Sequence, residues 1–561
     1  MESSTSKVYA STDNTSDIVV DKLIAWKVEL IFSLVGDGIN PIFEALRKRK
    51  DKIRLITVRH EEAAAFMASG YAKCTGRLGV CLGTNGPGAV HLMNGLYDAA
   101  MEGASVLAIT GVVPHDLMGT RFIQEVDTLA VLKDIAVYSQ LITGPVHAQT
   151  VVDLACRGAL TTPGLSHLAI ATDTQMMLLS EDKHSKKGGH LTGSSTFFSR
   201  VQVPADDELE QAAALLNNSS KIMILAGRGA LGARAEVEAL ADKLGAPVAK
   251  ALLGKALLPD DSPFTTGGTG HLGTSPSNQG LQECNTLLML GTNMPYLQYY
   301  PKAEHTKGIQ IDNDPTRIGL RYPVEVGLAG DVKATLKALL PKIEQHSDRS
   351  FLSLAQQRMI EWKQKMAKLE SDGATPIKPP FLVSQVSKLI KDDAHISIDT
   401  GAHTVFTARH LAIKSKQQIT VCGNLASMGP GLPYAIAAQL AYPGRQCIAM
   451  VGDGGFTMLM GEMATAVLYN LPIKVIIFKN NILAMDLWEQ EEIGGKRYGI
   501  DLLPIDFAKI AEACGAEGYK CTDPADLPAV LTRAFASKRP CVIEVDVDPY
   551  AEPASPEKLE A

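Results

Sequence analysis

A glycine-rich turn in the C-terminal third of the chain has residues that could bind a metal ion and a phosphate group. The apolar run QCIAMV ends in Gly452-Asp453-Gly454-Gly455, and a second apolar run, IKVIIF, ends in Lys479-Asn480-Asn481. Glycines let backbone N–H groups approach a phosphate at a helix N-terminus, where the helix dipole favours negative charge. Asp453 and Asn480 supply the hard oxygen atoms that Mg²⁺ prefers. Such a turn is most often structural, but the asparagine after a second run favours a metal-diphosphate site.

The N-terminal third contains groups suited to acid–base chemistry. Arg59-His60-Glu61-Glu62 directly follows an apolar run and opens a helical pattern. The structural alternative for Glu61 is a carboxylate that the helix dipole favours at a helix start. His91, and Gln124 in the segment RFIQEVD, are candidates for polar contacts with a substrate, although either could equally be a satisfied polar group of the core.

These residues sit in a regular alternation of strand-length apolar runs with segments of helical period. That alternation predicts α/β domains in which helices cover both faces of parallel sheets. The expected strand-then-turn units form three sets. The first is 30–38, 52–60, 78–88 and 105–111, and the second is 221–229, 246–254, 286–295 and 307–315, closing near 338–343. The third is 395–403, 418–424, 446–455, 473–481 and 541–549. One helix is expected over 456–469, and ligands are expected at the carboxyl ends of the strands.

The chain therefore divides into three predicted doubly wound domains. The expected segments are a disordered polar leader (1–16), a first domain (17–180), a linker (181–199), a middle domain (200–343), a connector with a charged helix (344–378), a third domain (379–550) and a tail (551–561). The first and third sets have similar patterns, which predicts an internal duplication around a different middle domain.

Composition limits the classes of function. The 561 residues are too many for one core, and 46% apolar with 20% charged residues excludes a disordered or fibrous chain. A net charge of −7 without a basic cluster argues against nucleic acid and anionic membrane surfaces. The 9 cysteines never form CxxC, so a reducing, cytoplasmic location is expected. The tail lacks an apolar face, and no membrane anchor is expected.

The segment from Gly452 to Asn480 resembles the signature of thiamine-diphosphate enzymes. The resemblance implies that Asp453 and Asn480 bind Mg²⁺ through their side chains and Ile482 through its carbonyl group. It also implies that the glycines of the turn, Gly452, Gly454 and Gly455, lie at the diphosphate. Lys479 stands where the family usually has the first of two asparagines.

Other motifs match the same family. The resemblance implies that Glu61 is the acid that drives the aminopyrimidine ring into its imino tautomer, which deprotonation of the thiazolium C2 requires. Met428, in GNLASMGPGLP, matches the bulky residue that props the cofactor into its V shape. Gly401 and His403 resemble the turn that contacts the diphosphate. The first and third domains are thus the implied pyrimidine-binding and diphosphate-binding domains.

The middle domain resembles the FAD-binding domain of pyruvate oxidases and quinone-linked pyruvate dehydrogenases. The similar segments are Gly227-Arg228-Gly229, GTNMPY (291–296), QIDNDP (310–315) and GDV (330–332). The resemblance implies that these turns contact FAD through Gly227, Gly229, Thr292, Asp312 and Asp331, the two aspartates accepting hydrogen bonds from ribose or adenine. Acetohydroxyacid synthases share this architecture and bind FAD without using its redox chemistry.

Three positions bear on the reaction. Glu489 matches the active-site glutamate of pyruvate oxidases, where synthases have tryptophan, although it also belongs to an acidic run that could simply face solvent. Ile123 and Met485 replace phenylalanines of related enzymes and so alter the expected pocket for the 2-oxo acid.

The resemblance implies a thiamine-diphosphate- and Mg²⁺-dependent decarboxylation of pyruvate or a similar 2-oxo acid, with oxidation of the enamine intermediate through FAD. The alternatives are an acetolactate-synthase-like carboligase, in which FAD is structural or absent, and a non-catalytic relative that binds the cofactor. The family's active sites lie between subunits, so a homo-oligomer is implied, at least a dimer and usually a tetramer.

Overall fold

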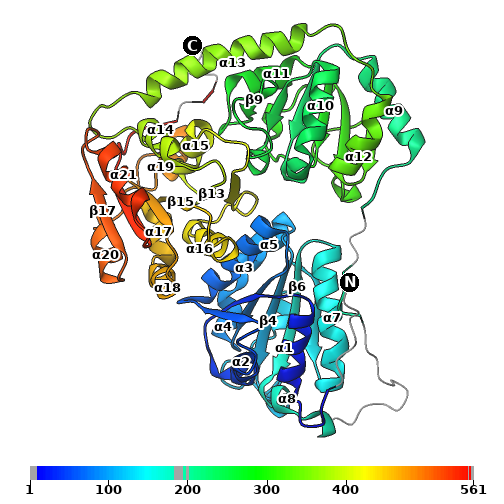
Figure 1. Cartoon of the computed structure of the whole chain (residues 1–561), viewed down its shortest axis with the longest axis vertical. Helices are drawn as coiled ribbons and strands as arrows, with labels where there is room; N and C mark the ends of the chain where they lie inside the picture. Colours follow the sequence, from blue (N-terminus) through cyan, green and yellow to red (C-terminus); the bar gives the residue numbers. More distant parts are fainter. Residues whose placement is uncertain (1–8, 182–193, 198–200, 554, 557–561) are drawn as a thin grey trace.

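The computed structural model of the chain describes residues 9–181, 194–197, 201–553 and 555–556. Most of the predicted linker, 181–199, and half of the predicted leader, 1–16, therefore lie outside the described residues. The described part forms three sheets, each of 6 strands. In Figure 1 the first domain lies below the other two, which stand side by side.

The first and third sheets have the same topology. The first sheet has the order β2-β1-β3-β4-β6-β5, and the third has the equivalent order β14-β13-β15-β16-β18-β17. Their strands are β1 (Leu30–Ser33), β2 (Arg54–Thr57), β3 (Gly79–Gly83), β4 (Val106–Val112), β5 (Ala136–Ile142), β6 (Leu165–Ala171), β13 (His395–Ile398), β14 (Gln418–Val421), β15 (Cys447–Gly452), β16 (Lys474–Lys479), β17 (Glu517–Cys521) and β18 (Cys541–Asp546). The two domains therefore share one topology, as the similar sequence patterns predicted.

The middle sheet has a different topology, with the order β12-β11-β10-β7-β8-β9. Its strands are β7 (Ile222–Ala226), β8 (Val248–Lys250), β9 (Thr265–Gly268), β10 (Thr286–Leu290), β11 (Lys307–Asp312) and β12 (Val326–Ala329). Read from β9, this is the 3-2-1-4-5-6 order of dinucleotide-binding folds, in which the strand order reverses between β7 and β10. All strand pairs in the three sheets are parallel, as predicted.

Helices cover both faces of each sheet, and separate apolar cores fill the two sides. The first domain has α1 (Thr15–Ala25), α2 (Asn40–Arg47), α3 (Glu61–Thr75), α4 (Pro87–His91), α5 (Met93–Glu102), α6 (Thr128–Val131), α7 (Pro145–Thr161) and α8 (Thr172–Met176). The middle domain has α9 (Asp206–Asn217), α10 (Arg234–Leu244), α11 (Ser275–Glu283) and α12 (Val332–Leu339). The third has α14 (Pro379–Leu389), α15 (Ala402–His410), α16 (Gly431–Ala441), α17 (Asp453–Leu459), α18 (Glu462–Leu468), α19 (Ala484–Glu492), α20 (Phe507–Ala513) and α21 (Leu527–Ala536).

The predicted charged connector is the long helix α13 (Ser350–Glu370), which crosses from the middle domain to the third domain in Figure 1. The first and third domains meet through α3 and α16, whose side chains share one apolar core. Gly70 of α3 lies against Tyr434 of α16 so closely that a Cβ atom there would be 2.6 Å from the ring. None of the described helices is both long and apolar enough to cross a membrane.

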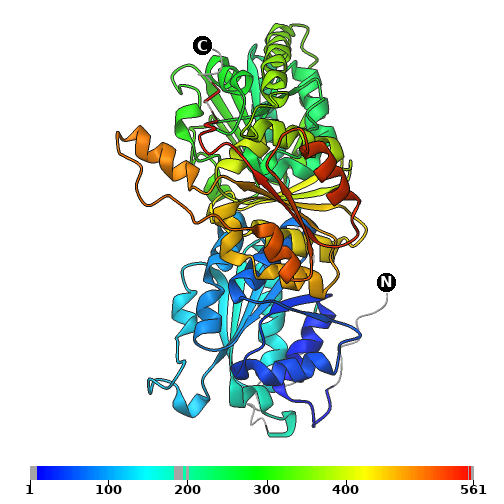
Figure 2. The same cartoon turned by 90° about the vertical axis from the view of Figure 1, so that its left-hand side faces the viewer.

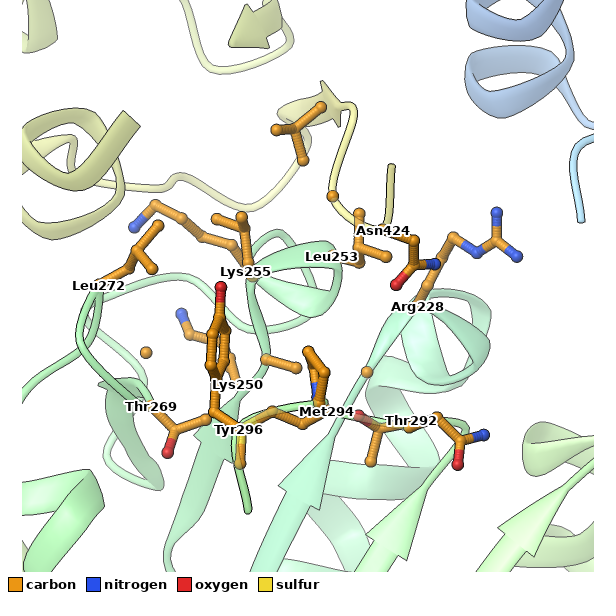
Figure 3. Close-up of a pocket in the computed structure, with 18 of the residues that line it drawn as sticks. Arg228, Lys250, Leu253, Lys255, Thr269, Leu272, Thr292, Met294, Tyr296 and Asn424 are labelled. Carbon is orange, nitrogen blue, oxygen red and sulfur yellow. The ribbon is translucent and has the colours of Figure 1, made fainter. Parts of the chain in front are cut away.

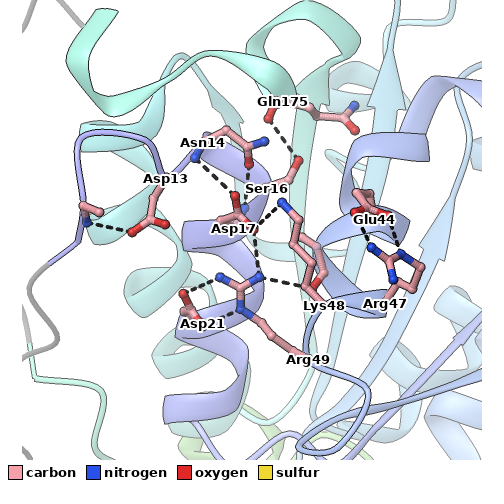
Figure 4. Close-up of polar contacts among 12 residues, drawn as sticks. Asp13, Asn14, Ser16, Asp17, Asp21, Glu44, Arg47, Lys48, Arg49 and Gln175 are labelled. Atoms are coloured by element: carbon pink, nitrogen blue, oxygen red, sulfur yellow. Dashed lines mark hydrogen bonds and ion pairs between the residues drawn. The ribbon is translucent and has the colours of Figure 1, made fainter.

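The ordered chain begins earlier than the predicted end of the leader. Asn14 caps α1, because its side chain accepts the N–H of Asp17 while the Asp17 carboxylate accepts the N–H of Asn14. Arg49, just after α2, donates to the carboxylates of Asp17 and Asp21 at 2.7 and 2.6 Å, as Figure 4 shows. The leader prediction is therefore wrong for residues 14–16, whose polar side chains cap and start a buried helix.

The helix predicted over 456–469 is also wrong in detail, since α17 starts at Asp453 and a break near Gly461 separates it from α18. The segment 338–343 is the end of α12 and a 3-10 turn rather than a strand. Five strands were not predicted: β5, β6, β9, β12 and β17. Four of them, β5, β9, β12 and β17, are sheet edges and lack a continuous apolar run. The fifth, β6, is interrupted by the buried polar residues Ser166 and His167.

Candidate functional site

A small cavity lies at the carboxyl ends of β13, β15 and β16, and we call it the cradle. β13 and β15 are neighbours although β14 separates them in sequence, so their end turns leave a crevice between them. The cradle is lined by Thr400, Gly401, Ala402, His403, Met428, Gly452, Asp453, Gly454, Gly455, Phe478, Asn480, Ile482, Leu483, Ala484, Met485 and Asp486. The structure thus brings together every third-domain residue expected at the diphosphate and the metal ion.

Asp453 links the two turns that carry the predicted metal ligands. Its Oδ2 atom accepts the N–H of Asn480 at 3.1 Å and the N–H of Asn481 at 2.6 Å. The side-chain oxygen of Asn480 accepts the N–H of Ile482 at 3.1 Å. Burial raises the pKa of Asp453, against the effect of its hydrogen bonds from backbone N–H groups. A cation bound here would offset that cost, and carboxylate, amide and carbonyl oxygens are the ligands that suit Mg²⁺.

The opposite wall of the cradle fits an anionic group. His403 is buried and its Nε2 atom has no hydrogen-bond partner among the described residues. Burial lowers the pKa of His403 to about 4, so the ring is neutral near pH 7. A Cβ atom on Gly452 would lie 2.9 Å from this ring, and one on Gly454 would lie 3.2 Å from the methyl group of Met428. Only glycines leave the backbone N–H groups open to a ligand here.

The sequence analysis did not identify Asp399, which joins two turns of the cradle. Its carboxylate accepts the N–H groups of Thr400 at 2.7 Å, Gly429 at 2.9 Å and Gly431 at 3.3 Å. Burial raises the pKa of Asp399 to about 6, although these hydrogen bonds lower it. Asp399 fixes the loop that carries Met428. An aspartate directly after a strand, as in HISIDTG, was the signal that could have found it.

A second group of predicted residues gathers in the first domain, around the turn between β3 and α4. The Nδ1 atom of His91 lies 3.0 Å from Oε2 of Glu61. Glu61 also lies beside Gly88, where a Cβ atom would be 3.3 Å from its Oε1. Gln124 covers Gly86 and its side chain accepts a hydrogen bond from Asn85 at 3.2 Å. Glu61 is buried, while His91 is half-exposed.

His60 completes this group but does not make it a metal site. Ligand atoms of His60, Glu61 and His91 lie within 4.8 Å of one another. The Nδ1 atom of His60, however, accepts the N–H of Glu62 at 3.1 Å as the cap of α3. In the neutral ring the proton is then on Nε2, which offers no lone pair to a metal ion. Glu462 of α18, also not predicted, accepts the N–H groups of Arg59 and His60 and so fixes this turn against the third domain.

A larger cavity of about 280 Å³, which we call the cleft, lies at the strand-order reversal between β7 and β10 (Figure 3). Its lining includes the predicted residues Gly227, Gly229, Thr292 and Asp312. The turns after the two strands touch, because a Cβ atom on Gly229 would lie 2.8 Å from Cα of Gly291. This is the place where open α/β sheets bind their ligands.

Polar groups in the cleft fit a ligand with hydrogen-bonding groups. Asn293 lines the cleft, and both polar atoms of its side chain are buried and have no hydrogen-bond partner among the described residues. Burial raises the pKa of Asp312, which also lines the cleft. Asp331 does not lie where a contact with FAD was expected. It is not among the lining residues, and its carboxylate accepts the N–H of Ala334 at 2.8 Å as the cap of α12.

The cleft and the cradle are adjacent. Thr400, Gly401 and Met485 line both cavities. By contrast, no described residue of the first domain lines the cradle, so Glu61, His91 and Gln124 of this chain do not face it. Glu489 lines neither cavity and is exposed on α19. In Figure 2 this orange helix projects away from the body of the chain.

Comparison with known proteins agrees with this architecture. Family models of thiamine pyrophosphate enzymes match residues 13–131 (N-terminal TPP binding domain), 209–339 (central domain) and 399–545 (C-terminal TPP binding domain). The chain is 38% identical over 541 residues to the Bacillus subtilis protein named "Putative thiamine pyrophosphate-containing protein YdaP", covering 96% of this chain and 92% of that one.

Two further relatives carry different activities in their names. The chain is 30% identical to a pyruvate oxidase of Lactiplantibacillus plantarum, over 94% of this chain and 87% of the relative. It is 29% identical to an acetolactate synthase large subunit of Porphyra purpurea, over 94% of this chain and 91% of the relative. The chain belongs to the thiamine pyrophosphate enzyme family.

Proposed function

We propose that this protein is a thiamine-diphosphate- and Mg²⁺-dependent enzyme that decarboxylates pyruvate or a similar 2-oxo acid and passes two electrons to FAD. The observation that carries the proposal is the adjacency of the two cavities, which share Thr400, Gly401 and Met485. These three residues would contact both a ligand of the cleft and a ligand of the cradle, as electron transfer between two bound cofactors needs. Such contact is unnecessary when FAD is only structural.

Within the cradle, the residues divide into a metal end and a reacting end. Asp453, Asn480 and the carbonyl group of Ile482 would hold Mg²⁺ at the diphosphate. His403, as a neutral N–H donor, and the glycine turns would bind the phosphate oxygens. Met428 would hold the bent shape of the cofactor, which when bound supplies an electron sink for the carbanion left by CO₂ loss.

Glu61 would exchange a proton with the aminopyrimidine ring of the cofactor. Its burial beside His91 excludes water from one side of the carboxyl group. His91 and Gln124 lie on the same turn region and would face the substrate from the first domain. Neither residue lies in the cradle of its own chain, which supports an active site shared between two copies.

We therefore propose a homo-oligomer, with a dimer as the minimum and a tetramer as the expected form, in which the first domain of one copy covers the cradle of another. A mixture of inactive Glu61→Gln and Asp453→Asn chains tests this arrangement. Random exchange should restore about a quarter of the wild-type turnover, because half of the dimers are mixed and one of their two sites is intact. Turnover that stays absent after exchange would place both residues in a site within one chain.

The second candidate is a carboligase of the acetolactate synthase type. The exposed position of Glu489 favours it, because this residue was expected to mark an oxidase and does not face either cavity of its own chain. In that reaction the decarboxylated fragment adds to a second 2-oxo acid and the flavin keeps its oxidation state.

Anaerobic addition of pyruvate to the purified holoenzyme separates the two reactions. Loss of the flavin absorption bands within the turnover time supports oxidation. Unchanged bands with accumulation of acetolactate or acetoin would reject the oxidase function in favour of carboligation. Glu61→Gln is the control, since it should leave the bands unchanged and form neither product.

A further inference from the structure

One lysine in the cleft has no counter-charge of its own. Lys255 follows the short turn Leu252–Gly254 after β8 and lines the cleft. Its side chain is 8% exposed, and among the described residues its ammonium group has one ion-pair partner, the carboxylate of Asp260. The nearest carboxylate oxygen is Oδ2 of Asp260, at 3.7 Å. That distance is longer than a good N–H···O hydrogen bond, and a buried ammonium with one weak partner is costly unless a further partner binds it.

Asp260 is already used by other groups. Its Oδ1 atom accepts a hydrogen bond from Lys250 at 2.7 Å, and its Oδ2 atom accepts the N–H of Ile413 at 2.8 Å. Lys250 also donates to the carbonyl group of Leu258 at 2.8 Å. One carboxylate therefore faces two buried lysines, and Lys250 is the one it satisfies. The pair of lysines and the single aspartate leave one positive charge in the wall of the cleft.

The position of Lys255 in the wall of the cleft favours a role in ligand binding over a role in holding the fold together. The preceding Gly254 packs on the turn after β7, where a Cβ atom would be 2.6 Å from the carbonyl oxygen of Ala226. That contact places Lys255 beside the strand-order reversal. In Figure 3, Lys255 and Arg228 lie at different ends of the cleft. Burial lowers the pKa of Lys255, and Asp260 offsets this only in part.

We propose that Lys255 binds a negatively charged group of the ligand that occupies the cleft. The inference rests on the proposed function in taking that ligand to be FAD. FAD carries negative charge in two places, on its pyrophosphate and, once reduced, on the flavin ring at N1 and the C2 carbonyl group. Both present the same chemistry to an ammonium group, and they differ in whether the charge exists before reduction.

The variant Lys255→Met distinguishes the pyrophosphate from the reduced flavin ring as the group that Lys255 binds. Three quantities are measured: the affinity of the apoprotein for ADP, its affinity for FAD, and the midpoint potential of the bound flavin. ADP has the phosphates without the flavin ring. If Lys255 binds the pyrophosphate, the variant should bind both ADP and FAD about tenfold or more weakly. If it binds the reduced ring, ADP affinity should stay unchanged. The variant's reduced flavin should then be about tenfold less favoured, which lowers the two-electron potential by about 30 mV.

The stability of the apoprotein distinguishes binding from a structural role. Removing a buried charge that is only weakly paired with Asp260 should keep or raise the melting temperature of the ligand-free protein, whereas loss of a structural contact would lower it. Lys255→Arg should recover affinity or potential because it keeps the charge. Lys243→Met is the matched control, since Lys243 lies in the same domain outside the cleft and donates to the carbonyl groups of Leu340 and Ile343.

Two negative outcomes have different meanings. If the wild type binds FAD and Lys255→Met matches it in ADP affinity, FAD affinity and potential, the assignment of Lys255 is overturned and the proposed function stands. If the wild type binds neither ADP nor FAD, both the flavin function and the role of Lys255 are rejected. Should Lys255→Met fail to fold, Lys255→Gln provides the same comparison with a polar side chain of similar length.

Discussion

Glu61 and His91 form a hydrogen-bonded pair, with Nδ1 of His91 3.0 Å from Oε2 of Glu61. The imidazole of His91 also stacks on that of His60, with ring centroids 4.6 Å apart. Glu61 is the first residue of α3 and His91 the last of α4, so two helix ends hold the pair. This arrangement fixes the carboxyl group from one side and leaves its other oxygen near Gly88 for a ligand.

Replacing Glu61 should remove catalysis without removing the cofactor. Glu61→Gln keeps the shape of the side chain but cannot exchange the proton, so turnover should fall by at least about 100-fold. Thiamine diphosphate retention, measured by equilibrium dialysis, should stay within a few-fold of wild type. Glu62→Gln is the control, because Glu62 accepts a hydrogen bond from Asn94, whereas Glu61 is the carboxylate bonded to His91. Turnover in Glu61→Gln close to that of the control would show that another group exchanges the proton.

Metal removal and loss of Asp453 should have the same effect on cofactor binding. Chelation with EDTA should release thiamine diphosphate, and added Mg²⁺ should restore binding, because the diphosphate is held through the ion. Asp453→Asn should weaken thiamine diphosphate binding at saturating Mg²⁺ by about 100-fold. The measurement is dialysis with and without metal. Asp506→Asn, which removes a carboxylate charge of the same domain but keeps an oxygen that can cap α20, should bind the cofactor normally. Metal-independent binding by the wild type would contradict the assignment.

The lysine that replaces the family's usual asparagine is part of a buried ion pair. Lys479 donates to Glu544 at 2.6 Å, and the other oxygen of Glu544 accepts the N–H groups of Phe507 and Ala508. Lys479→Met leaves a buried carboxylate with only the half-exposed Lys520 nearby, which should cost about 3–5 kcal/mol of stability. Calorimetric melting temperatures should show this loss.

The double variant tests whether pairing is the cause. Lys479→Met combined with Glu544→Gln removes both charges, so most of the lost melting temperature should return. If the double variant is no more stable than Lys479→Met alone, the ion pair is not what holds this region together. Lys479 directly precedes Asn480, and thiamine diphosphate affinity should fall with Lys479→Met even at temperatures where the variant is folded.

Acid should destabilise the first domain through a buried neutral histidine. His167 is fully buried between the hydroxyl groups of Thr110 and Ser139, at 2.8 and 2.9 Å. Burial lowers the pKa of His167 from 6.5 to about 4. The unfolded chain therefore binds more protons between these two values, and stability falls as pH decreases through this window.

His167→Gln should make the melting temperature less sensitive to pH between 6.5 and 4, whatever its stability at neutral pH. The comparison is a series of calorimetric scans at fixed ionic strength. His305→Gln, at an exposed position of the middle domain, should keep the wild-type pH dependence. An identical slope in wild type and His167→Gln would mean that this ring is not the group that titrates.

The sequence alone determined the fold class and the positions of the glycine-rich turns that line the cradle and the cleft. These depend on local patterns, because most buried parallel strands are near-continuous apolar runs and the turns after them carry glycines or ligand residues. Asp453, Asn480 and the cleft glycines were found in this way. Edge strands such as β9 (TTGG) and β12 (VGLA) were missed because each is only 4 residues long and neither has a continuous apolar run.

Tertiary structure decided which groups meet. Asp331 and Asp312 look alike in sequence, yet one caps a helix and the other faces the cleft. Lys255 became notable only because folding buries it next to a carboxylate that Lys250 and Ile413 already use. The separation of Glu61 from the cradle of its own chain likewise depends on how whole domains pack. Distances between residues far apart in sequence follow from packing, and no local spacing encodes them.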